Sequence, residues 1–397
     1  MDPLAIFPQE ITDVIFKHLT VNELLTATEV SKTWNEVIGA SSKVMQRIQL
    51  SLFWLKESMF LTDDVNYALV NSTRKYQHID FRYQSCHLEG MQAILSSNNR
   101  KWKSVRLERL NFNSTAHLID FLKLIEKTVV HLELFDIYVA SNVETDNIDF
   151  EKLKILRLKF IDGLIDKAFS KCCNLEELSV TSSYQSNEAL HKIFMQNAKL
   201  QNLTLSSLIF NEIFSLEVIH ETCFKLKVFK AKDYYRGSMG ANLAPFLEKH
   251  MPFLEELSLD NINSETLKII FHMPKLKKLR LGNINFHDNV ISALQLPVNQ
   301  SIEVLSYHDT DNGLSNMKSI IEATPNVKEL KIYSLTQEMV TFLSMQAKKL
   351  EKLLLRTIDA DDMSNHELFP CLKFLNVEII TSSFEDHLLA IEKDKQN

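Results

Sequence analysis

The chain has 397 residues and a net charge of −7, with 56 leucines but only 7 glycines. The glycine shortage argues against nucleotide-binding folds, because their phosphate loops need closely spaced glycines, and the acidic balance disfavours general nucleic-acid binding. The sequence has no apolar run long enough for a membrane span and opens without a secretory signal, so we expect a protein of the cytoplasm or nucleus.

Residues 6–45 carry apolar side chains at helical spacing, in three short groups. The groups are Ile11, Val14, Ile15 and Leu19; Val21, Leu24 and Leu25; and Val30, Trp34, Val37 and Ile38. Thr20 and Glu23 have the spacing of a capping box, which predicts that a helix begins there. So short a segment buries too little surface to be stable alone, and its apolar residues spread around each helix. We therefore expect it to pack against the rest of the chain, against a partner, or against both.

One apolar frame recurs thirteen times between residues 76 and 380. Each copy has apolar residues at positions i, i+3 and i+5, often with a fourth at i+8, as in Leu153, Leu156, Leu158 and Ile161. The third position runs from Phe81 to Val377 in steps of 22 to 28 residues, with a mean near 25. Such regularity indicates a repeat architecture.

Two periods inside each copy predict a strand followed by a helix. The i+3 and i+5 residues alternate as in a short strand, and the segments between copies carry helix-period apolar residues such as Leu118, Phe121 and Leu122. Prolines predicted to end the helices stand two residues before four of the copies: Pro252, Pro274, Pro325 and Pro370. Three buried leucines contribute about 5–9 kcal/mol, but ordering a repeat costs tens of kcal/mol, so the repeats must stack. The predicted fold is α/β, a horseshoe solenoid with a parallel sheet on the concave side and helices outside.

The segments flanking the repeats have expected roles of their own. Residues 46–75 are predicted to form a rigid junction and N-terminal cap, because Val44, Ile48 and Leu50 continue the apolar frame without a flexible linker. Residues 381–397 are predicted to be a C-terminal capping helix and tail. The helix would cover residues 382–391, which combine a Ser/Asp-rich start with apolar Phe384, Leu388 and Ile391.

Two resemblances to known families rest on these residues. Residues 76–380 resemble the leucine-rich-repeat superfamily, and Cys172-Cys173-Asn174-Leu175 is similar to its cysteine-containing subclass. Residues 6–45 resemble the F-box. This likeness rests on Phe7-Pro8-x-Glu10-Ile11, Ile15-Phe16-x-x-Leu19, Glu23-Leu24-Leu25 and Val30-Ser31-Lys32-Thr33-Trp34. The departures are Phe7 for Leu, Ser31 for Cys, Thr33 for a basic residue and Met45 for a second Trp; none changes the apolar frame.

Together the resemblances imply an F-box/leucine-rich-repeat protein, the non-catalytic substrate receptor of an SCF (Skp-cullin-F-box) ubiquitin ligase. Residues 1–45 would dock the Skp adaptor and, through it, the cullin scaffold, while the repeats would bind the protein destined for degradation. The residues carried over for adaptor binding are Pro8, Ile11, Ile15, Leu19, Leu24, Leu25, Val30 and Trp34. The alternatives are a non-degradative leucine-rich-repeat binding or scaffold protein, and an N-terminal segment that only caps the solenoid.

The residues flanking the strand leucines predict a concave face richer in cations than the whole chain, with eleven basic and eight acidic side chains. An acidic or phosphorylated cargo segment could bind there; the alternative is ordinary solvated strand charges. The repeat step of 28 residues also contains a lengthened loop with two tyrosines and an arginine, suited either to a contact at the rim or to a plain surface loop. The cargo-binding candidates are Lys230, Lys232, Tyr234, Tyr235, Arg236, Lys278, Arg280 and Lys331.

The sequence predicts no catalysis, cofactor or metal. Its five cysteines are scattered without C-x-x-C spacing, so we interpret them as small core residues. The thirteen histidines are equally dispersed. No Ser/His/Asp, Cys/His or paired-carboxylate pattern emerges, and the expected partners are therefore proteins.

Overall fold

The chain folds into two compact units, Met1–Leu200 and Gln201–Asn397. The computed structural model describes residues 4, 6–53, 63–72, 74–82, 88–97, 100–140, 148–161, 168–181, 187–232, 240–282, 295–308, 314–335, 337–358 and 372–380. The predicted C-terminal capping helix and Pro370 lie outside these residues.

The first unit begins with four short helices, α1 (Gln9–Lys17), α2 (Val21–Ala27), α3 (Lys32–Ala40) and α4 (Ser42–Met45). The predicted capping box is confirmed at α2, where the Thr20 amide donates to Glu23 Oε2 at 2.6 Å and the Glu23 amide donates to Thr20 Oγ1 at 3.3 Å. Phe16 is fully buried, and its ring centroid lies 6.1 Å from that of Trp34. This aromatic pair and Leu24, also fully buried, provide an internal core for the three longer helices.

The helices are tied to the segment that follows them. Arg47 Nη1 donates to the carbonyl of Phe16 at 2.7 Å, and Arg74 Nη2 donates to Asn35 Oδ1 at 2.6 Å. A Cβ on Gly39 would lie 3.2 Å from Cγ of Arg74, so the chain approaches closely there. The N-terminal helices thus contact the residues that follow them in the first unit.

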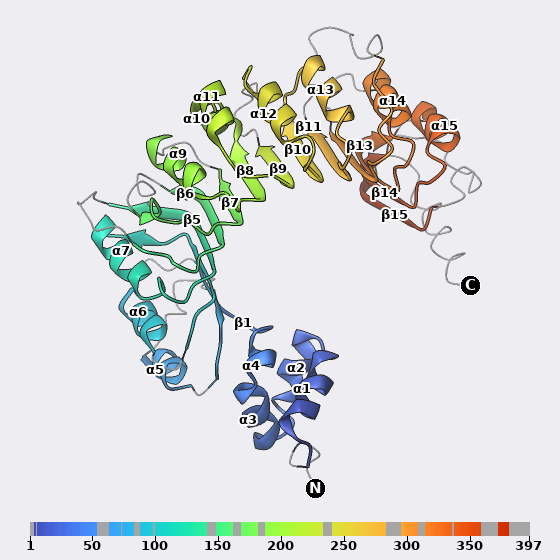
Figure 1. The fold of residues 1–397 in the computed structure, drawn as a ribbon. Helices are drawn as coiled ribbons and strands as arrows, with labels where there is room; N and C mark the ends of the chain where they lie inside the picture. Colours follow the sequence, from blue (N-terminus) through green and yellow to red (C-terminus); the bar gives the residue numbers. More distant parts are fainter. Residues whose placement is uncertain are drawn as a thin grey trace, which may run out of the picture. The chain divides into compact units, whose positions relative to one another are not determined.

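The rest of the first unit is a parallel sheet with helices on one face (Figure 1). Its strands pair in the order β1-β2-β3-β5-β6-β7, and a short β4 pairs with the far end of β5. The strands are β1 (Gln49–Phe53), β2 (His78–Arg82), β3 (Ser104–Glu108), β4 (Asn111–Phe112), β5 (His131–Val139), β6 (Ile155–Ile161) and β7 (Glu177–Val180). The helices are α5 (Asp63–Asn71), α6 (Leu88–Ser96), α7 (Thr115–Lys123) and α9 (Asn187–Gln196).

The second unit repeats this arrangement with strands β8 to β15, each parallel to its neighbours in chain order. The strands are β8 (Asn202–Ser206), β9 (Val228–Lys232), β10 (Glu256–Asp260), β11 (Lys278–Gly282), β12 (Val304–His308), β13 (Glu329–Leu335), β14 (Lys352–Ile358) and β15 (Phe374–Ile380). The helices are α10 (Ser207–Ile213), α11 (Leu216–Glu221), α12 (Leu243–His250), α13 (Ser264–Phe271), α14 (Leu314–Glu322) and α15 (Gln337–Gln346).

The repeat prediction is confirmed: the second and third positions of each of the thirteen apolar frames fall on a strand, β2, β3 and β5 to β15. The frame leucines stand in register, for example Leu257 opposite Leu279 and Leu259 opposite Leu281, and all four are buried. The sheet of the first unit starts one strand before the first predicted repeat, because β1 pairs with β2 within the segment expected to be a junction. The prolines behave as predicted where the structure describes them, with α12, α13 and α14 ending shortly before Pro252, Pro274 and Pro325.

Buried amides hold the turns between neighbouring repeats. Asn197, fully buried, donates from Nδ2 to the carbonyls of Cys172 and Ile193, both at 2.7 Å, and its Oδ1 accepts from the amide of Leu175 at 2.7 Å. In the second unit Asn299 Nδ2 donates to the carbonyls of Phe271 and Met273. These side chains satisfy backbone groups that the stacked repeats shield from water.

Candidate binding site

The N-terminal helices expose an unusual share of the apolar surface. Of the seventeen large apolar side chains that are exposed among the described residues, eight lie within residues 6–30. We call these the N-terminal apolar set: Ile6, Phe7, Ile11, Val14, Ile15, Val21, Leu25 and Val30, each between 36% and 65% exposed. Contiguous exposed apolar patches mark interaction surfaces, and these eight side chains come from one segment of 25 residues.

The eight residues predicted to bind an adaptor divide into two groups. Leu24 is buried inside the helices, and Leu19 and Trp34 are half-buried. The other five are exposed: Pro8, Ile11, Ile15, Leu25 and Val30. The motif therefore separates into residues that hold the helices together and residues available to a partner.

Across the first unit, the middle residues of the strands form a row of alternating charge on the face opposite the helices. In register from β1 to β7, the row is Ser51, Asp80, Arg106, Glu133, Arg157 and Ser179. Arg106 lies 3.3 Å from Glu133 and 3.8 Å from Asp80, and Arg157 lies 2.7 Å from Glu133. Each charge in this row is thus neutralised by its neighbour on the next strand.

Burial and these ion-pair partners shift the pKa values of Glu133 and Arg157 in opposite directions. Burial alone raises the pKa of Glu133, but the hydrogen bond from His131 and the charges of Arg157 and Arg106 outweigh it, so the pKa lies below its usual value. Partial burial lowers the pKa of Arg157, whereas Glu177 and Glu133 raise it above its usual value. The charges of this face stabilise one another, which leaves little net charge for a ligand.

The same row in the second unit lacks acids. In register from β8 to β13 it reads Thr204, Lys230, Ser258, Arg280, Ser306 and Lys331. Lys230 makes an ion pair with Glu256, which lies in the adjacent row. Arg280 and Lys331 are exposed, and among the described residues neither side chain has an ion-pair or hydrogen-bond partner.

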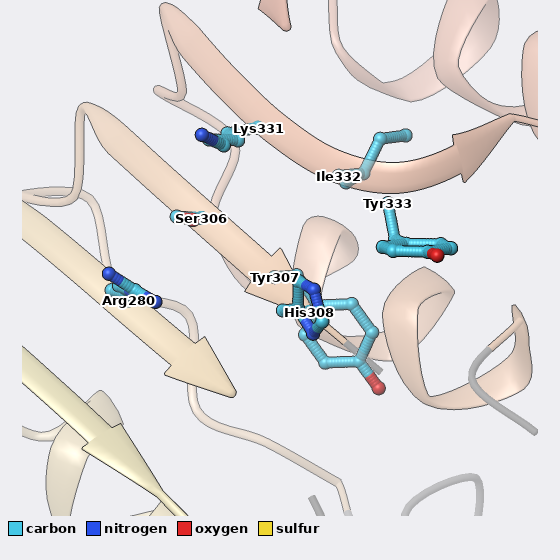
Figure 2. A pocket seen from close by; sticks show the side chains of 7 residues that line it. All are labelled: Arg280, Ser306, Tyr307, His308, Lys331, Ile332 and Tyr333. Carbon is cyan, nitrogen blue, oxygen red and sulfur yellow. The ribbon is translucent and has the colours of Figure 1, made fainter. Parts of the chain in front are cut away.

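A pocket of about 240 Å³ opens over the strands that carry these two cations. It is lined by Arg280, Ser306, Tyr307, His308, Lys331, Ile332 and Tyr333. Figure 2 shows Arg280, Ser306 and Lys331 on three neighbouring strands, with His308 and Tyr333 farther along β12 and β13. Because neighbouring strands are about 4.8 Å apart, the backbones at Arg280 and Lys331 are about 10 Å apart, with Ser306 between them. We call this the basic pocket.

The basic pocket has a defined wall on its aromatic side. The His308 and Tyr333 rings meet edge to face, with centroids 5.1 Å apart and planes at 78°. Tyr307 and Ile332 are buried and pair in register, so the strands beneath the pocket are anchored in the core. The lining residues carry a guanidinium, an ammonium, an imidazole and three hydroxyl groups, of which that of Tyr307 belongs to a buried side chain, and no carboxylate lines the pocket among the described residues.

The structure brings together two of the predicted cargo-binding residues, Arg280 and Lys331. Lys278 is exposed in the adjacent row, opposite Glu256 and Val304. The backbone of Lys232 belongs to β9, while Tyr234, Tyr235 and Arg236 lie outside the described residues. Sequence reasoning missed Ser306, His308 and Tyr333. Their signal was present, because they occupy the same strand positions as the charged candidates, but only charged side chains were counted at those positions.

Other kinds of site are absent from the part of the chain that the structure describes. It holds no group of three or more His, Cys, Asp or Glu side chains placed to bind a metal. Cys172 is buried as expected of a core residue, but the same interpretation is wrong for Cys173 and Cys223, which are exposed. Among the described helices, none has the length and apolar character needed to cross a membrane.

Comparison with known proteins finds solved structures that are similar to this chain but no family to which it belongs. No protein-family model matches the chain, and no curated protein matches it. An internalin from Listeria monocytogenes is 12% identical with a TM-score of 0.41, covering 80% of this chain and 89% of its own. LegL7, a leucine-rich-repeat protein from Legionella pneumophila, is 14% identical with a TM-score of 0.36, covering 76% and 91%. A leucine-rich-repeat protein from Leptospira interrogans is 13% identical with a TM-score of 0.32, covering 84% and 90%.

Two of these neighbours are described as leucine-rich-repeat proteins. All three TM-scores are below 0.5, so the comparison carries no argument about the fold, activity or partners of this chain. The repeat architecture of this chain rests on its own strand register and on the buried leucines at the frame positions.

Proposed function

We propose that this protein is the non-catalytic substrate receptor of an SCF-type ubiquitin ligase, with residues 1–45 docking the Skp adaptor and the repeats binding a protein cargo. The observation that carries the proposal is the exposure of Ile11, Ile15, Leu25 and Val30, which stand at motif positions of the F-box resemblance. An adaptor that covered these side chains would remove them from water, which is favourable by about 25 cal/mol per Å² of apolar area.

The internal packing of the helices supports the same role. Phe16 and Leu24 are fully buried and Phe16 contacts Trp34, so the helices keep a core of their own while other apolar residues face outward. A segment that only capped the sheet would direct most of its apolar residues toward the sheet. The 40–65% exposure of Ile11, Val14, Ile15 and Val30 argues against that alternative.

The repeats supply the cargo-binding part of the proposal. Stacked strand–helix units present a long surface on which each strand adds a few side chains, and such surfaces recognise proteins. The second unit carries cations on this surface that no described carboxylate neutralises, which suits an anionic cargo. The receptor would act by holding the cargo near a ubiquitin donor supplied by the rest of the ligase.

Co-purification with the Skp adaptor and the cullin tests the proposal. We expect the wild-type chain to capture both, and the double variant Ile15→Asp with Leu25→Asp to lose both, because each aspartate would have to be desolvated at the adaptor interface. The control is Leu216→Asp with Val298→Asp, which places the same charges on apolar side chains elsewhere that are at least as exposed. The control should bind as the wild type does.

Unfolding in urea should be similar for all three chains, since the altered residues are exposed. Absence of adaptor binding by the wild type, or equal binding by both double variants, would contradict the proposal. Capture of the adaptor without the cullin would favour the non-degradative binding protein instead.

A further inference from the structure

Arg280 and Lys331 differ from three lysines in or beside the strands of the second unit that have ion-pair partners, and from Lys278, which is exposed but does not line the pocket. Lys352 lies 3.3 Å from Glu329, Lys328 lies 3.2 Å from Glu303, and Lys230 pairs with Glu256. Each of these lysines pairs with a glutamate on a neighbouring repeat. Arg280 and Lys331 face a common pocket that no described carboxylate lines.

The residue between two neighbouring cations differs between the two units. In the first unit the equivalent row places Glu133 between Arg106 and Arg157, within 3.3 Å of both. In the second unit Ser306 holds the position between Arg280 and Lys331. A hydroxyl group cannot neutralise two cations, but it can donate a hydrogen bond to an anion that does. The fold therefore leaves the place of an acidic side chain open to an anion from outside.

The groups around the pocket match a phosphoryl group better than a carboxylate. A guanidinium presents a planar fork of donors that suits phosphate oxygens, and the lysine ammonium adds a second charge. Ser306, His308 and Tyr333 can donate further hydrogen bonds, as their positions around the pocket allow. A phosphate monoester carries a charge of about −1.5 to −2 at pH 7 and three terminal acceptor oxygens. A carboxylate carries one charge and two acceptor oxygens.

The size of the pocket bears on what carries the phosphoryl group. Pockets for whole drug-sized molecules have volumes of about 300–1,000 Å³, whereas the basic pocket measures about 240 Å³. It has room for one charged group and the atoms that join it to a larger ligand. A modified side chain on a protein cargo meets this description.

We infer that the basic pocket binds the phosphoryl group of a phosphate monoester, presented by the cargo as a phosphorylated side chain. Arg280 and Lys331 hold the charge from two sides, and Ser306 donates between them. The assignment to a cargo rests on the proposed receptor role, but the chemistry of the pocket does not. Binding of a phosphorylated peptide can therefore be measured without the adaptor.

The test measures binding of fluorescent peptide libraries to the full chain by anisotropy. One library fixes a phosphoserine among random residues, and the others fix serine or glutamate at that position. We expect the phosphoserine library to bind at least 10-fold more tightly than either. Arg280→Gln with Lys331→Gln should reduce its binding to the level of the serine library. The control Lys268→Gln with Lys275→Gln removes the same charge from two exposed lysines outside the pocket and should keep the preference.

A second arm identifies the source of the phosphoryl group. Inorganic phosphate and free O-phosphoserine are titrated against the thermal unfolding of the chain at constant ionic strength. One outcome is that these probes stabilise the wild-type chain, that the pocket variant abolishes this stabilisation, and that the phosphoserine library does not bind. That outcome supports the pocket chemistry and assigns it to a small phosphate compound instead of a cargo side chain. Equal binding of the phosphoserine and glutamate libraries, equal losses in the pocket and control variants, or no response to any phosphate probe would overturn the inference. Adaptor capture is measured on the same variants, so that failure of the receptor role is seen separately.

Discussion

Asp80 Oδ2 accepts a hydrogen bond from Arg82 Nη2 at 2.6 Å, although the Asp80 side chain is completely buried and that of Arg82 is 29% exposed. Gln49 Nε2 also donates to Asp80 Oδ2, at 3.2 Å, and Arg106 lies 3.8 Å away. The carboxylate thus joins β1, β2 and β3, and it is the first anion in the alternating row of the first unit.

The substitution Asp80→Ala should destabilise the first unit by about 2 kcal/mol, the usual scale for losing hydrogen bonds to a charged group. The loss stays near that value because Arg82 and Arg106, each about 30% exposed, can recover water. The free energy of unfolding in urea measures it. Asp120→Ala is the control: Asp120 is 65% exposed and pairs only with Lys123 among the ion pairs described, so we expect a change below about 0.5 kcal/mol. Equal losses in the two variants would show that the buried network does not stabilise the sheet.

Asn197→Ala should cost about 3 kcal/mol or more, because it leaves one amide and two carbonyl groups of the backbone without partners in a buried turn. Denaturant unfolding again provides the measurement. Asn326, which donates to the Gln300 carbonyl and accepts from Lys349 near the surface, serves as the matched asparagine. Its replacement by Ala should cost less than about 1 kcal/mol. A smaller loss at position 197 than at position 326 would contradict the role assigned to the buried amide.

His250 should make stability depend on pH. Burial, and secondarily the charge of Lys249, lowers the pKa of His250 to about 4, and its Nε2 is buried without a partner among the described residues. In the unfolded chain its pKa is about 6.5, so between these pH values only the unfolded chain binds the proton. The free energy of unfolding therefore falls as the pH drops from about 6.5 toward 4, by up to about 3 kcal/mol from this residue.

His250→Phe should flatten that part of the pH profile while keeping an aromatic ring against Phe224, 5.4 Å away. Urea unfolding at several pH values between 4 and 7 compares the slopes. The exposed His272, replaced by Phe, should leave the wild-type slope unchanged. A profile equally steep in His250→Phe and wild type would assign the effect to other groups.

The two adjacent cysteines should differ in reactivity. Burial raises the pKa of the Cys172 thiol to about 12, so almost no thiolate forms at neutral pH, and the side chain is 1% exposed. Because the thiolate is the nucleophile, iodoacetamide should modify the exposed Cys173 and Cys223 of the native chain but not Cys172. Peptide mapping by mass spectrometry distinguishes the sites, and unfolding in urea should make Cys172 react. Native labelling of Cys172 and Cys173 at equal rates would be inconsistent with this packing.

The repeats could be predicted residue by residue, because the constraint that produces them is local. A strand buried on one face must alternate, and a helix that returns over it must have its own period, so Leu257 and Leu259 identify β10 without knowledge of any other repeat. The capping box at Thr20 was recognisable for the same reason. The short β4 was not foreseen, since two residues carry too little pattern to mark a strand.

The candidate site was predictable only in part. The sequence placed Arg280 and Lys331 on the same face, but the same reasoning grouped them with Lys230, whose charge Glu256 neutralises. Ser306, His308 and Tyr333 occupy the same strand positions as the charged candidates, but their residue types alone do not indicate a pocket. They line the basic pocket because the strand register brings them beside the two cations.

The sequence alone thus determined the period, the strands and the residues of the core, since these follow from apolar spacing within one repeat. Which charges remain available was decided by the tertiary structure. An ion pair depends on cross-strand register between repeats about 25 residues apart, and the sequence of either repeat does not contain the position of its neighbour. The first unit uses that register to neutralise its cations with Glu133 and Asp80, while the second leaves Arg280 and Lys331 facing an open pocket.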